Sequence, residues 1–239
     1  KRKNIRVVKI PNSNPLFMFN KSMVTDELIL TLEYQFEEAK LFYPYQDFEI
    51  SRWQPFGLTQ YYNKLERVDI NKNLCYYSHA SWIRKDEDHH LPWFNEVELE
   101  LDLLDKISKS KCFKSNKIHI CLHPKEKASF EVLERAKKYY QDIFGQNVEF
   151  YYPNKNSFEA FKEFDLGFGA FSSILFERIQ CGYKTLIFNN KINEFPIAKS
   201  NFNYFVIDDF DTFLKRIHLT MDLNFEEFFK NQMNYTFNK

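Results

Sequence analysis

The amino-acid sequence predicts an α/β fold in which helices cover both faces of a parallel β-sheet. From residue 74 onward, short apolar runs alternate with stretches whose apolar residues recur at helical spacing. The chain has 239 residues, which is enough to bury a substantial core. Its hydrophobic content of 44% and charged content of 28% are typical of a soluble globular protein.

The first part of the chain, residues 1–73, is less regular, and we predict a smaller N-terminal segment there. A short apolar run indicates a strand over 6–10. Over 26–42, apolar residues at helical spacing, with acidic residues early and a lysine late, favour a helix. Two prolines and a glycine in 43–57 indicate a loop or linker, and 60–73 fits another short helix.

Residues 74–239 show a regular alternation that predicts a Rossmann-like domain. We expect strands over 74–83, 117–123, 147–152, 165–171, 184–190 and 204–209. Helices are expected over 97–110, 129–145, 157–164, 172–182 and 211–219. Gly145 and Gly182 mark helix ends, and Ser172 marks a helix start, because glycine favours C-terminal caps and serine N-terminal caps.

Charge and cysteine usage narrow the classes of function. Lys+Arg and Asp+Glu both number 33, so no global positive field attracts nucleic acid, and we expect no nucleic-acid partner. The four cysteines form no CxxC pair, which favours buried, reduced thiols and a cytoplasmic location. They are Cys75, Cys112, Cys121 and Cys181. No apolar run reaches membrane-spanning length.

The stretch KIHICLHPKEK places His123 and Pro124 where an apolar strand ends. In open α/β folds, ligands bind at the carboxyl edge of the sheet, so His123 is a candidate ligand contact. A charged imidazole beside a phosphate could stabilise or protonate a leaving group. The alternative is a turn histidine bonded to a backbone carbonyl.

A second candidate is GAFSS, residues 169–173, between a short strand and a helix start. Gly167 and Gly169 are expected to let the backbone approach a ligand. The hydroxyls of Ser172 and Ser173 then lie beside the free amides of the first helical turn, which attract anions and phosphate above all. The alternative is that Ser172 only caps the helix, which is worth about 1 kcal/mol.

The order of these motifs resembles a known family. A strand ending in HP, a strand ending in YP, the run DLGFGAFSSILFE and then GYKTLIF are similar to the C-terminal nucleotide-binding domain of GT-B glycosyltransferases. Within that fold, the pattern looks like bacterial sialyltransferases, polysialyltransferases and capsule or lipooligosaccharide transferases with HP and Ser/Thr-Ser motifs. The resemblance covers about residues 74–190.

The resemblance implies a role for each matching residue. His123 would contact the phosphate of a CMP-activated sugar and assist the departure of CMP. Ser172 and Ser173 would bind that phosphate, and Glu177 would hold the ribose hydroxyls. Taken together, the implied donor-binding residues are His123, Pro124, Tyr152, Pro153, Asn154, Gly169, Phe171, Ser172, Ser173 and Glu177. Stabilising the phosphate charge would do most of the catalysis, so neither a metal nor another cofactor is required.

A general base must still deprotonate the acceptor hydroxyl. The loop SWIRKDEDHH, residues 81–90, supplies acidic residues and histidines after the first strand, and Asp86 is the predicted base. The same cluster contains metal-ligand residue types, but its consecutive spacing suits one ion poorly. A solvated charged loop is the third interpretation. The family's acidic base motif ending in glycine is absent from the sequence.

We therefore expect a bacterial glycosyltransferase that moves a sugar, CMP-sialic-acid-like or CMP-Kdo-like, to a surface glycan or glycolipid. It would act in the cytoplasm or peripherally at the inner face of the membrane. Open alternatives are a CDP-glycerol-type polyol-phosphate transferase, a UDP- or GDP-sugar transferase, and a non-catalytic α/β interaction module.

Residues 1–73 are too few for a full second domain, so the acceptor side is reduced or the chain is part of a longer protein. The apolar stretch 217–237 either packs onto a neighbouring domain or contacts a membrane surface.

Overall fold

The computed structural model describes residues 8–9, 27–30, 49–52, 73–85, 94–110, 113, 117–151, 160–170, 172–191 and 205–232. Five predicted site residues lie outside these ranges, namely Asp86, Tyr152, Pro153, Asn154 and Phe171. Residues 60–72 of the helix predicted over 60–73 also lie outside the described residues, as does Cys112.

The larger sheet has six parallel strands in the order β6-β5-β4-β7-β8-β9, which confirms the predicted α/β fold. The strands are β4 (Leu74–Tyr77), β5 (Ile118–Cys121), β6 (Val148–Phe150), β7 (Leu166–Gly169), β8 (Thr185–Phe188) and β9 (Val206–Ile207). Apart from the exposed edge strand β6, nearly all their side chains are buried. Both faces of the sheet are therefore covered, as expected for parallel strands.

Alternation along β4 shows how helices cover the two faces. The Tyr76 ring packs against Tyr140 and Phe144 on one face, whereas Tyr77 packs against Phe161 on the other. The first face carries α4 (Phe94–Lys109), α5 (Phe130–Phe144) and α8 (Phe210–Met221). The second carries α6 (Ala160–Glu163) and α7 (Ser173–Gln180).

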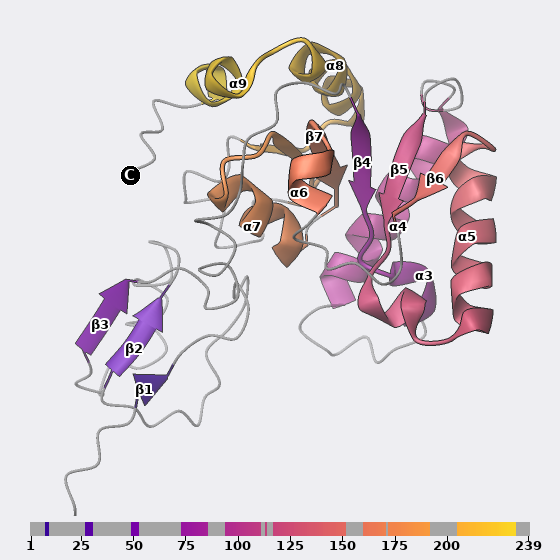
Figure 1. The fold of residues 1–239 in the computed structure, drawn as a ribbon, viewed down its shortest axis with the longest axis horizontal. Coiled ribbons are helices and arrows are strands. Elements are labelled where there is room, and N and C mark those ends of the chain that lie inside the picture. Colours follow the sequence, from indigo (N-terminus) through magenta and orange to yellow (C-terminus); the bar gives the residue numbers. More distant parts are fainter. Residues whose placement is uncertain are drawn as a thin grey trace, which may run out of the picture.

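A smaller parallel sheet, in the order β1-β2-β3, lies to one side of the larger one (Figure 1). Its strands are β1 (Val8–Lys9), β2 (Glu27–Leu30) and β3 (Glu49–Arg52). The strand predicted over 6–10 is confirmed at β1. The helix predicted over 26–42 is wrong at β2, and the loop predicted over 43–57 is wrong at β3. The run ELIL is short and apolar, and such a run fits a strand as well as a helix turn.

The end of β4 differs from the prediction of one strand over 74–83. The strand stops at Tyr77, Ala80 adopts a left-handed conformation with φ 60°, and α3 (Ser81–Arg84) follows. Aromatic residues without glycine or proline favour a continuous strand, and an alanine with positive φ is uncommon. Buried polar contacts hold this turn, because the Glu100 carboxyl group accepts the N–H groups of His79 and Ser81.

Helix ends follow the predicted signals closely. Gly145 caps α5 with φ 94°, and Gly182 follows α7 with φ 81°. Both glycines adopt the left-handed region that lets a helix stop without strain. Ser172 is the N-cap residue of α7, as predicted, but its side chain makes no capping hydrogen bond.

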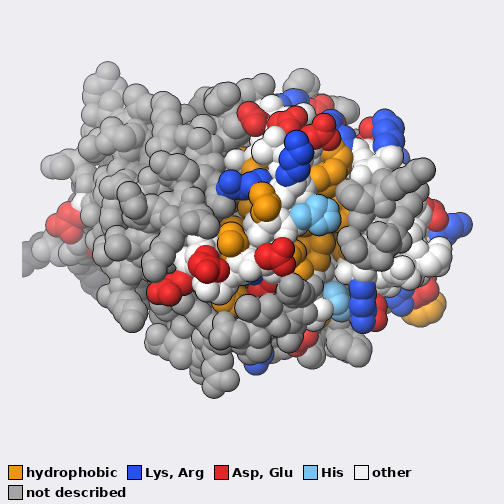
Figure 2. Space-filling view, turned by 90° about the horizontal axis from the view of Figure 1, so that it is seen from above, with side chains coloured by type: hydrophobic (Ala, Val, Ile, Leu, Met, Phe, Trp, Pro, Cys, Tyr) orange, Lys and Arg blue, Asp and Glu red, His pale blue; other side chains and the backbone are white. Residues whose placement is uncertain are grey.

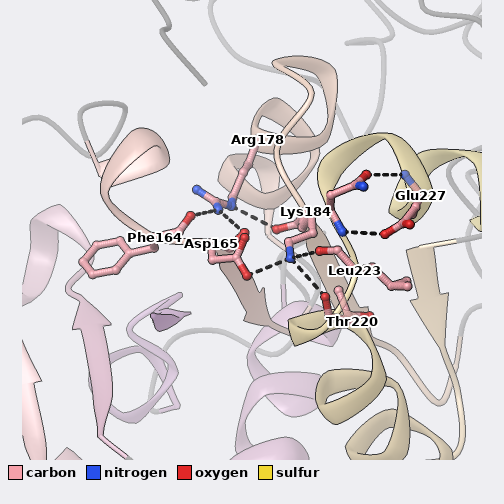
Figure 3. A network of polar contacts seen from close by, with 8 residues as sticks. Phe164, Asp165, Arg178, Lys184, Thr220, Leu223 and Glu227 are labelled. Atoms are coloured by element: carbon pink, nitrogen blue, oxygen red, sulfur yellow. Dashed lines mark hydrogen bonds and ion pairs between the residues drawn. The ribbon is translucent and has the colours of Figure 1, made fainter. Parts of the chain in front are cut away.

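Buried charge at the amino edge of the sheet forms a network of Asp165, Arg178 and Lys184, called here the amino-edge network (Figure 3). The Arg178 guanidinium donates to the carbonyl oxygens of Phe161 at 2.8 Å and Phe164 at 2.5 Å. The Lys184 ammonium lies 2.7 Å from the Asp165 carboxylate, and both side chains are fully buried. This network joins the starts of β7 and β8.

The same ammonium ties the C-terminal helices to the sheet. Lys184 donates to the carbonyl oxygens of Thr220 at 3.0 Å and Leu223 at 2.7 Å, between α8 and α9 (Phe225–Gln232). Phe225 packs edge-on against Tyr183, and Phe228 packs against Phe205. In its described part, the apolar stretch 217–237 therefore packs onto the α/β domain.

Surface charge and cysteines agree with the sequence-based picture. Acidic and basic side chains are interspersed on the described part of the face shown in Figure 2, without a large area of one sign. Cys75, Cys121 and Cys181 are buried and form no disulfide, as predicted. In the ranges that the structure describes, no helix combines the length and the apolar character needed to cross a bilayer.

Candidate functional site

The strand order reverses between β4 and β7, which are neighbours although β5 and β6 come between them in sequence. In doubly wound sheets, ligands bind in the crevice outside the carboxyl ends of the strands at this switch point. The segments that leave these ends carry His79 after β4, His123 after β5, Ser172 after β7 and Asn189 after β8. This edge is therefore the candidate site.

His79 lies at the switch point, and sequence analysis missed it. Its Nε2 lies 2.5 Å from Nη1 of Arg84 and 3.1 Å from Oε2 of Glu96. Arginine only donates, so Nε2 accepts, and a neutral imidazole then carries its proton on Nδ1. This buried Nδ1 has no hydrogen-bond partner among the described residues. Such a donor can bind a ligand oxygen.

Burial controls the ionisation of His79 and its neighbour. Burial first, and then the Arg84 charge, lower the pKa of His79 to about 3. Burial raises the pKa of Glu96 to about 8, which Arg84 only partly offsets. At neutral pH both members of the 3.1 Å contact are therefore mostly uncharged. The contact is therefore not an ion pair at neutral pH, and Arg84 supplies the positive charge.

His123 is the N-cap residue of the short helix η1 (Pro124–Lys127), with Pro124 at its first position. The imidazole Nδ1 accepts the backbone N–H of Lys125 at 3.2 Å, and the His123 N–H donates to Glu126 at 2.8 Å. With Nδ1 occupied as an acceptor, the neutral ring carries its proton on Nε2. His123 is thus a turn histidine, but its ring accepts a backbone N–H instead of bonding to a carbonyl, and Nε2 is left as a donor.

The surroundings of His123 are positive. Burial first, and then the charges of Arg84, Lys125 and Lys127, lower the pKa of His123 to about 4. The His123 ring lies edge-on to the His79 ring, with centroids 6.1 Å apart. A bound phosphate would neutralise these cations and raise the pKa of both rings. The structure therefore places two neutral imidazoles and three cations at adjoining strand ends.

Ser172 and Ser173 begin α7 beyond the carboxyl end of β7. Ser172 is buried, Ser173 is half-buried, and the Ser172 hydroxyl is not used for capping. Ser172 therefore occupies the N-cap position of α7 without a capping bond from its hydroxyl. Glu177 lies one turn along α7 and is also buried. The ligand roles of Ser172, Ser173 and Glu177 stay predictions.

The glycines before α7 have a role inside the protein. A Cβ on Gly167 would lie 2.5 Å from Nε of Arg178, and a Cβ on Gly169 would lie 2.8 Å from the carbonyl oxygen of Tyr77. Their small size therefore makes room for Arg178 and for β4. A direct ligand contact of Gly169 stays a prediction.

Asn189 follows β8 and was also missed by sequence analysis. Its side chain is fully buried, Oδ1 accepts the Lys191 N–H at 2.9 Å, and Nδ2 has no partner among the described residues. The signal that pointed to His123, a polar residue where an apolar strand ends, also applies to His79 and Asn189. It went unnoticed because YYSHASWI and LIFNN read as uninterrupted strands.

His123 and Ser172 belong to the same edge, but β4 separates their strands. Neighbouring strands lie about 5 Å apart, so these two strand ends are about 10 Å from each other. That separation suits a ligand of nucleotide size better than one small anion held by both. His79 lies between them.

Within the described ranges, no three His, Cys, Asp or Glu side chains converge as ligands for a metal ion. The cluster of 86–90, which contains the predicted base Asp86, lies outside those ranges.

Comparison with known proteins gives matches only at the level of structure. No protein-family model matches the chain, and no curated protein matches it in sequence. Its structure is similar to the wall teichoic acid polymerase TagF, with a TM-score of 0.42 and 15% identity, covering 98% of this chain and 65% of TagF. A TagF variant soaked with CDPG gives a TM-score of 0.36 and 14% identity, covering 88% of this chain and 53% of that one. The chain thus spans between about half and two thirds of the length of these polymerases.

Proposed function

We propose that this protein is a transferase that moves a sugar or a polyol phosphate from a nucleotide-activated donor. One observation carries the proposal. At the switch point of the parallel sheet, the buried His79 Nδ1 has no partner among the described residues, and His123 lies beside it. A doubly wound fold binds its ligand at this position, so an open donor here can bind a ligand.

The charges favour a phosphate-containing ligand. Arg84, Lys125 and Lys127 act on His123, and the free amides of α7 face the same edge of the sheet. When the bond between the donor phosphate and the transferred group breaks, negative charge grows on the phosphate. Cations and N–H donors that are already in place stabilise this charge. In this proposal, they do so without a metal ion or other cofactor.

The two histidines would have different tasks. His123 would donate from Nε2 to the departing phosphate. His79 would donate from Nδ1 to a ligand oxygen, because its Nε2 is occupied by Arg84. Neither ring, in this protonation state, offers a free acceptor for the proton of the acceptor hydroxyl. Asp86 therefore stays the proposed base.

The donor is proposed to be a cytidine nucleotide derivative, either a CMP-sugar or CDP-glycerol. Both would leave a cytidine phosphate at the same strand ends. The acceptor would be a bacterial surface glycan or glycolipid, reached on the cytoplasmic side of the membrane. Cys75 and Cys121 are buried and form no disulfide, which fits a reducing compartment.

Calorimetric titration tests nucleotide binding directly. The 239-residue chain is titrated with CMP, CDP, UDP and GDP, beside the variants His79→Ala and His123→Ala. His218→Ala, on the exposed side of α8, is the matched control. We expect a cytidine nucleotide to bind the wild type and His218→Ala equally, and each site variant at least about tenfold more weakly. No heat with any nucleotide would contradict the proposal.

A donor screen then separates the candidate reactions. Release of CMP is measured from CMP-sugars and from CDP-glycerol, each with and without a chelator. Turnover of one donor class identifies the transferred group, and activity that survives the chelator supports the metal-independent mechanism. Binding without turnover of any donor would favour a non-catalytic interaction module.

A further inference from the structure

Two buried glutamates hold the backbone of the histidine-bearing turns. Glu100, on α4, accepts the His79 N–H at 2.6 Å and the Ser81 N–H at 2.8 Å. Glu126, in η1, accepts the His123 N–H at 2.8 Å. Both side chains are fully buried. Each candidate ligand-binding histidine is thus fixed through its own amide by a carboxylate.

Glu126 differs from Glu100 because it contacts both turns. Its second oxygen, Oε1, accepts the Trp82 indole N–H at 2.6 Å and the Tyr140 hydroxyl at 2.8 Å. Trp82 belongs to α3, three residues after His79. One carboxylate therefore binds the turn after β5 and the helix that follows the turn after β4.

A chain of hydrogen bonds provides a second link between the turns. The Ala80 amide donates to Ser78 Oγ at 2.9 Å, Ser78 Oγ lies 2.6 Å from Tyr140 Oη, and Tyr140 donates to Glu126. Because the Tyr140 proton is used toward Glu126, Ser78 must donate to Tyr140. The donors all run in one direction, and the Glu126 carboxyl, whose pKa burial raises to about 7, is their final acceptor. Ala80 is the left-handed residue next to His79.

We propose that Glu126 is a positioning residue that fixes the turns of His79 and His123 relative to each other. That this positioning serves ligand binding by the two histidines rests on the proposed function. The coupling itself is a property of the protein without ligand, so it can be tested separately.

Glutamine is the informative substitution at this position. Its side chain has nearly the same shape but replaces one acceptor oxygen with an NH₂ donor. The Trp82 and His123 N–H groups bind different oxygens of Glu126, so in Glu126→Gln one of them must face that donor. Glu126→Asp keeps the carboxyl group and both of its oxygens on a shorter stem. Glu134→Gln, an exposed glutamate on α5 paired with Lys137, is the matched control.

The first test uses nuclear magnetic resonance of the histidine rings in the protein without ligand. In Glu126→Gln, we expect the imidazole signals of both His79 and His123 to move, while His218 on α8 stays unchanged. Glu134→Gln should move none of them. A shift of His123 alone, with His79 unmoved, would overturn the coupling.

Tyr140→Phe provides an independent variant should Glu126→Gln not fold. It removes the link through Ser78 but leaves the Glu126 bonds to Trp82 and to His123 intact. We expect the His79 signal to move more than the His123 signal. Unchanged signals of both rings would overturn the proposal.

The second test measures binding of CDP by calorimetry. We expect Glu126→Gln to weaken binding about tenfold or more, Glu126→Asp to weaken it less, and Glu134→Gln to leave it unchanged. Unaltered affinity in a Glu126→Gln protein whose two histidine signals have moved would show that positioning does not serve the site. If the wild type binds no nucleotide, the proposed function fails, and the ring signals alone decide whether Glu126 couples the turns.

Discussion

At the amino edge of the large sheet, Arg178 and Lys184 are fully buried, and their donors meet backbone carbonyl oxygens and the Asp165 carboxylate. At the carboxyl edge, His79 Nδ1 and Asn189 Nδ2 are buried and make no hydrogen bond with any described residue. Both edges bury polar groups in the same sheet. They differ in whether the protein itself supplies acceptors for the buried donors.

This difference separates a stabilising site from a candidate binding site. A buried donor without a partner costs about 1–3 kcal/mol, so folding alone gives no reason to keep one. A ligand that supplies the missing acceptor would recover that free energy on binding. The amino-edge network should therefore govern stability, and the carboxyl edge should govern ligand binding.

The largest effect is expected for Arg178→Met. The substitution keeps an apolar stem but leaves the buried carbonyl oxygens of Phe161 and Phe164 without their donor. We expect the free energy of unfolding to fall by about 4 kcal/mol, measured by urea denaturation. A loss below about 1 kcal/mol would show that the network is not the main polar support of the fold.

The next effect concerns the buried ion pair. Lys184→Met leaves the Asp165 carboxylate buried without its cation, and we expect a loss of about 3 kcal/mol. Adding Asp165→Asn removes the uncompensated charge, so the double variant should be more stable than Lys184→Met alone. A double-mutant cycle of unfolding free energies measures this coupling. Strict additivity of the two substitutions would contradict it.

A pH-dependent effect is expected for Glu96→Gln at the carboxyl edge. Burial raises the pKa of Glu96 from 4.5 to about 8, so between these values the folded protein binds more protons than the unfolded chain. The contribution of Glu96 to stability is therefore complete below about pH 4.5 and is lost as the pH rises to 8.

Comparing the wild type with Glu96→Gln isolates the contribution of this one carboxyl group. The unfolding free energy of the wild type minus that of Glu96→Gln should fall between pH 5 and pH 8, with a slope of at most about 1.4 kcal/mol per pH unit. Urea denaturation at several pH values provides the measurement. A difference that does not change with pH would mean that Glu96 is not buried in its neutral form.

The smallest stability effect is expected for Ser172→Ala, with Ser129→Ala as the comparison. Ser129 caps α5 by accepting the Val132 N–H at 3.2 Å, whereas the Ser172 hydroxyl makes no capping bond. We expect Ser129→Ala to cost about 1 kcal/mol and Ser172→Ala a few tenths. Ser172→Ala should instead weaken cytidine nucleotide binding, which Ser129→Ala should not. The reverse pattern would assign Ser172 to helix capping.

Much of the large domain could be predicted, because its signals are local. The alternation of strands and helices, the positive φ of Gly145 and Gly182, and the place of His123 after β5 follow from neighbouring residues. The N-terminal strands β2 and β3 were harder to predict than those of the large domain. Over Glu27–Leu30, a short apolar run fits either a strand or a helix, and pairing with another strand decides.

The turn after β4 shows why part of the site was missed. Ala80 takes a left-handed conformation that its own residue type disfavours. Glu100, about twenty residues later, holds the turn through the amides of His79 and Ser81. In the sequence, Glu100 is one of several acidic residues of α4, and nothing local distinguishes it. Its burial follows from the packing of α4 on the sheet.

The sequence by itself determined the class of fold, the positions of most elements beyond residue 74 and the two motifs around His123 and Ser172. These depend on hydrophobic periodicity and on capping residues, which act over a few positions. Only the tertiary structure decided that His79 lies at the switch point, and that Glu126 joins its turn to that of His123. Those facts depend on strand order and on hydrogen bonds between distant segments, which exist only after the sheet has formed.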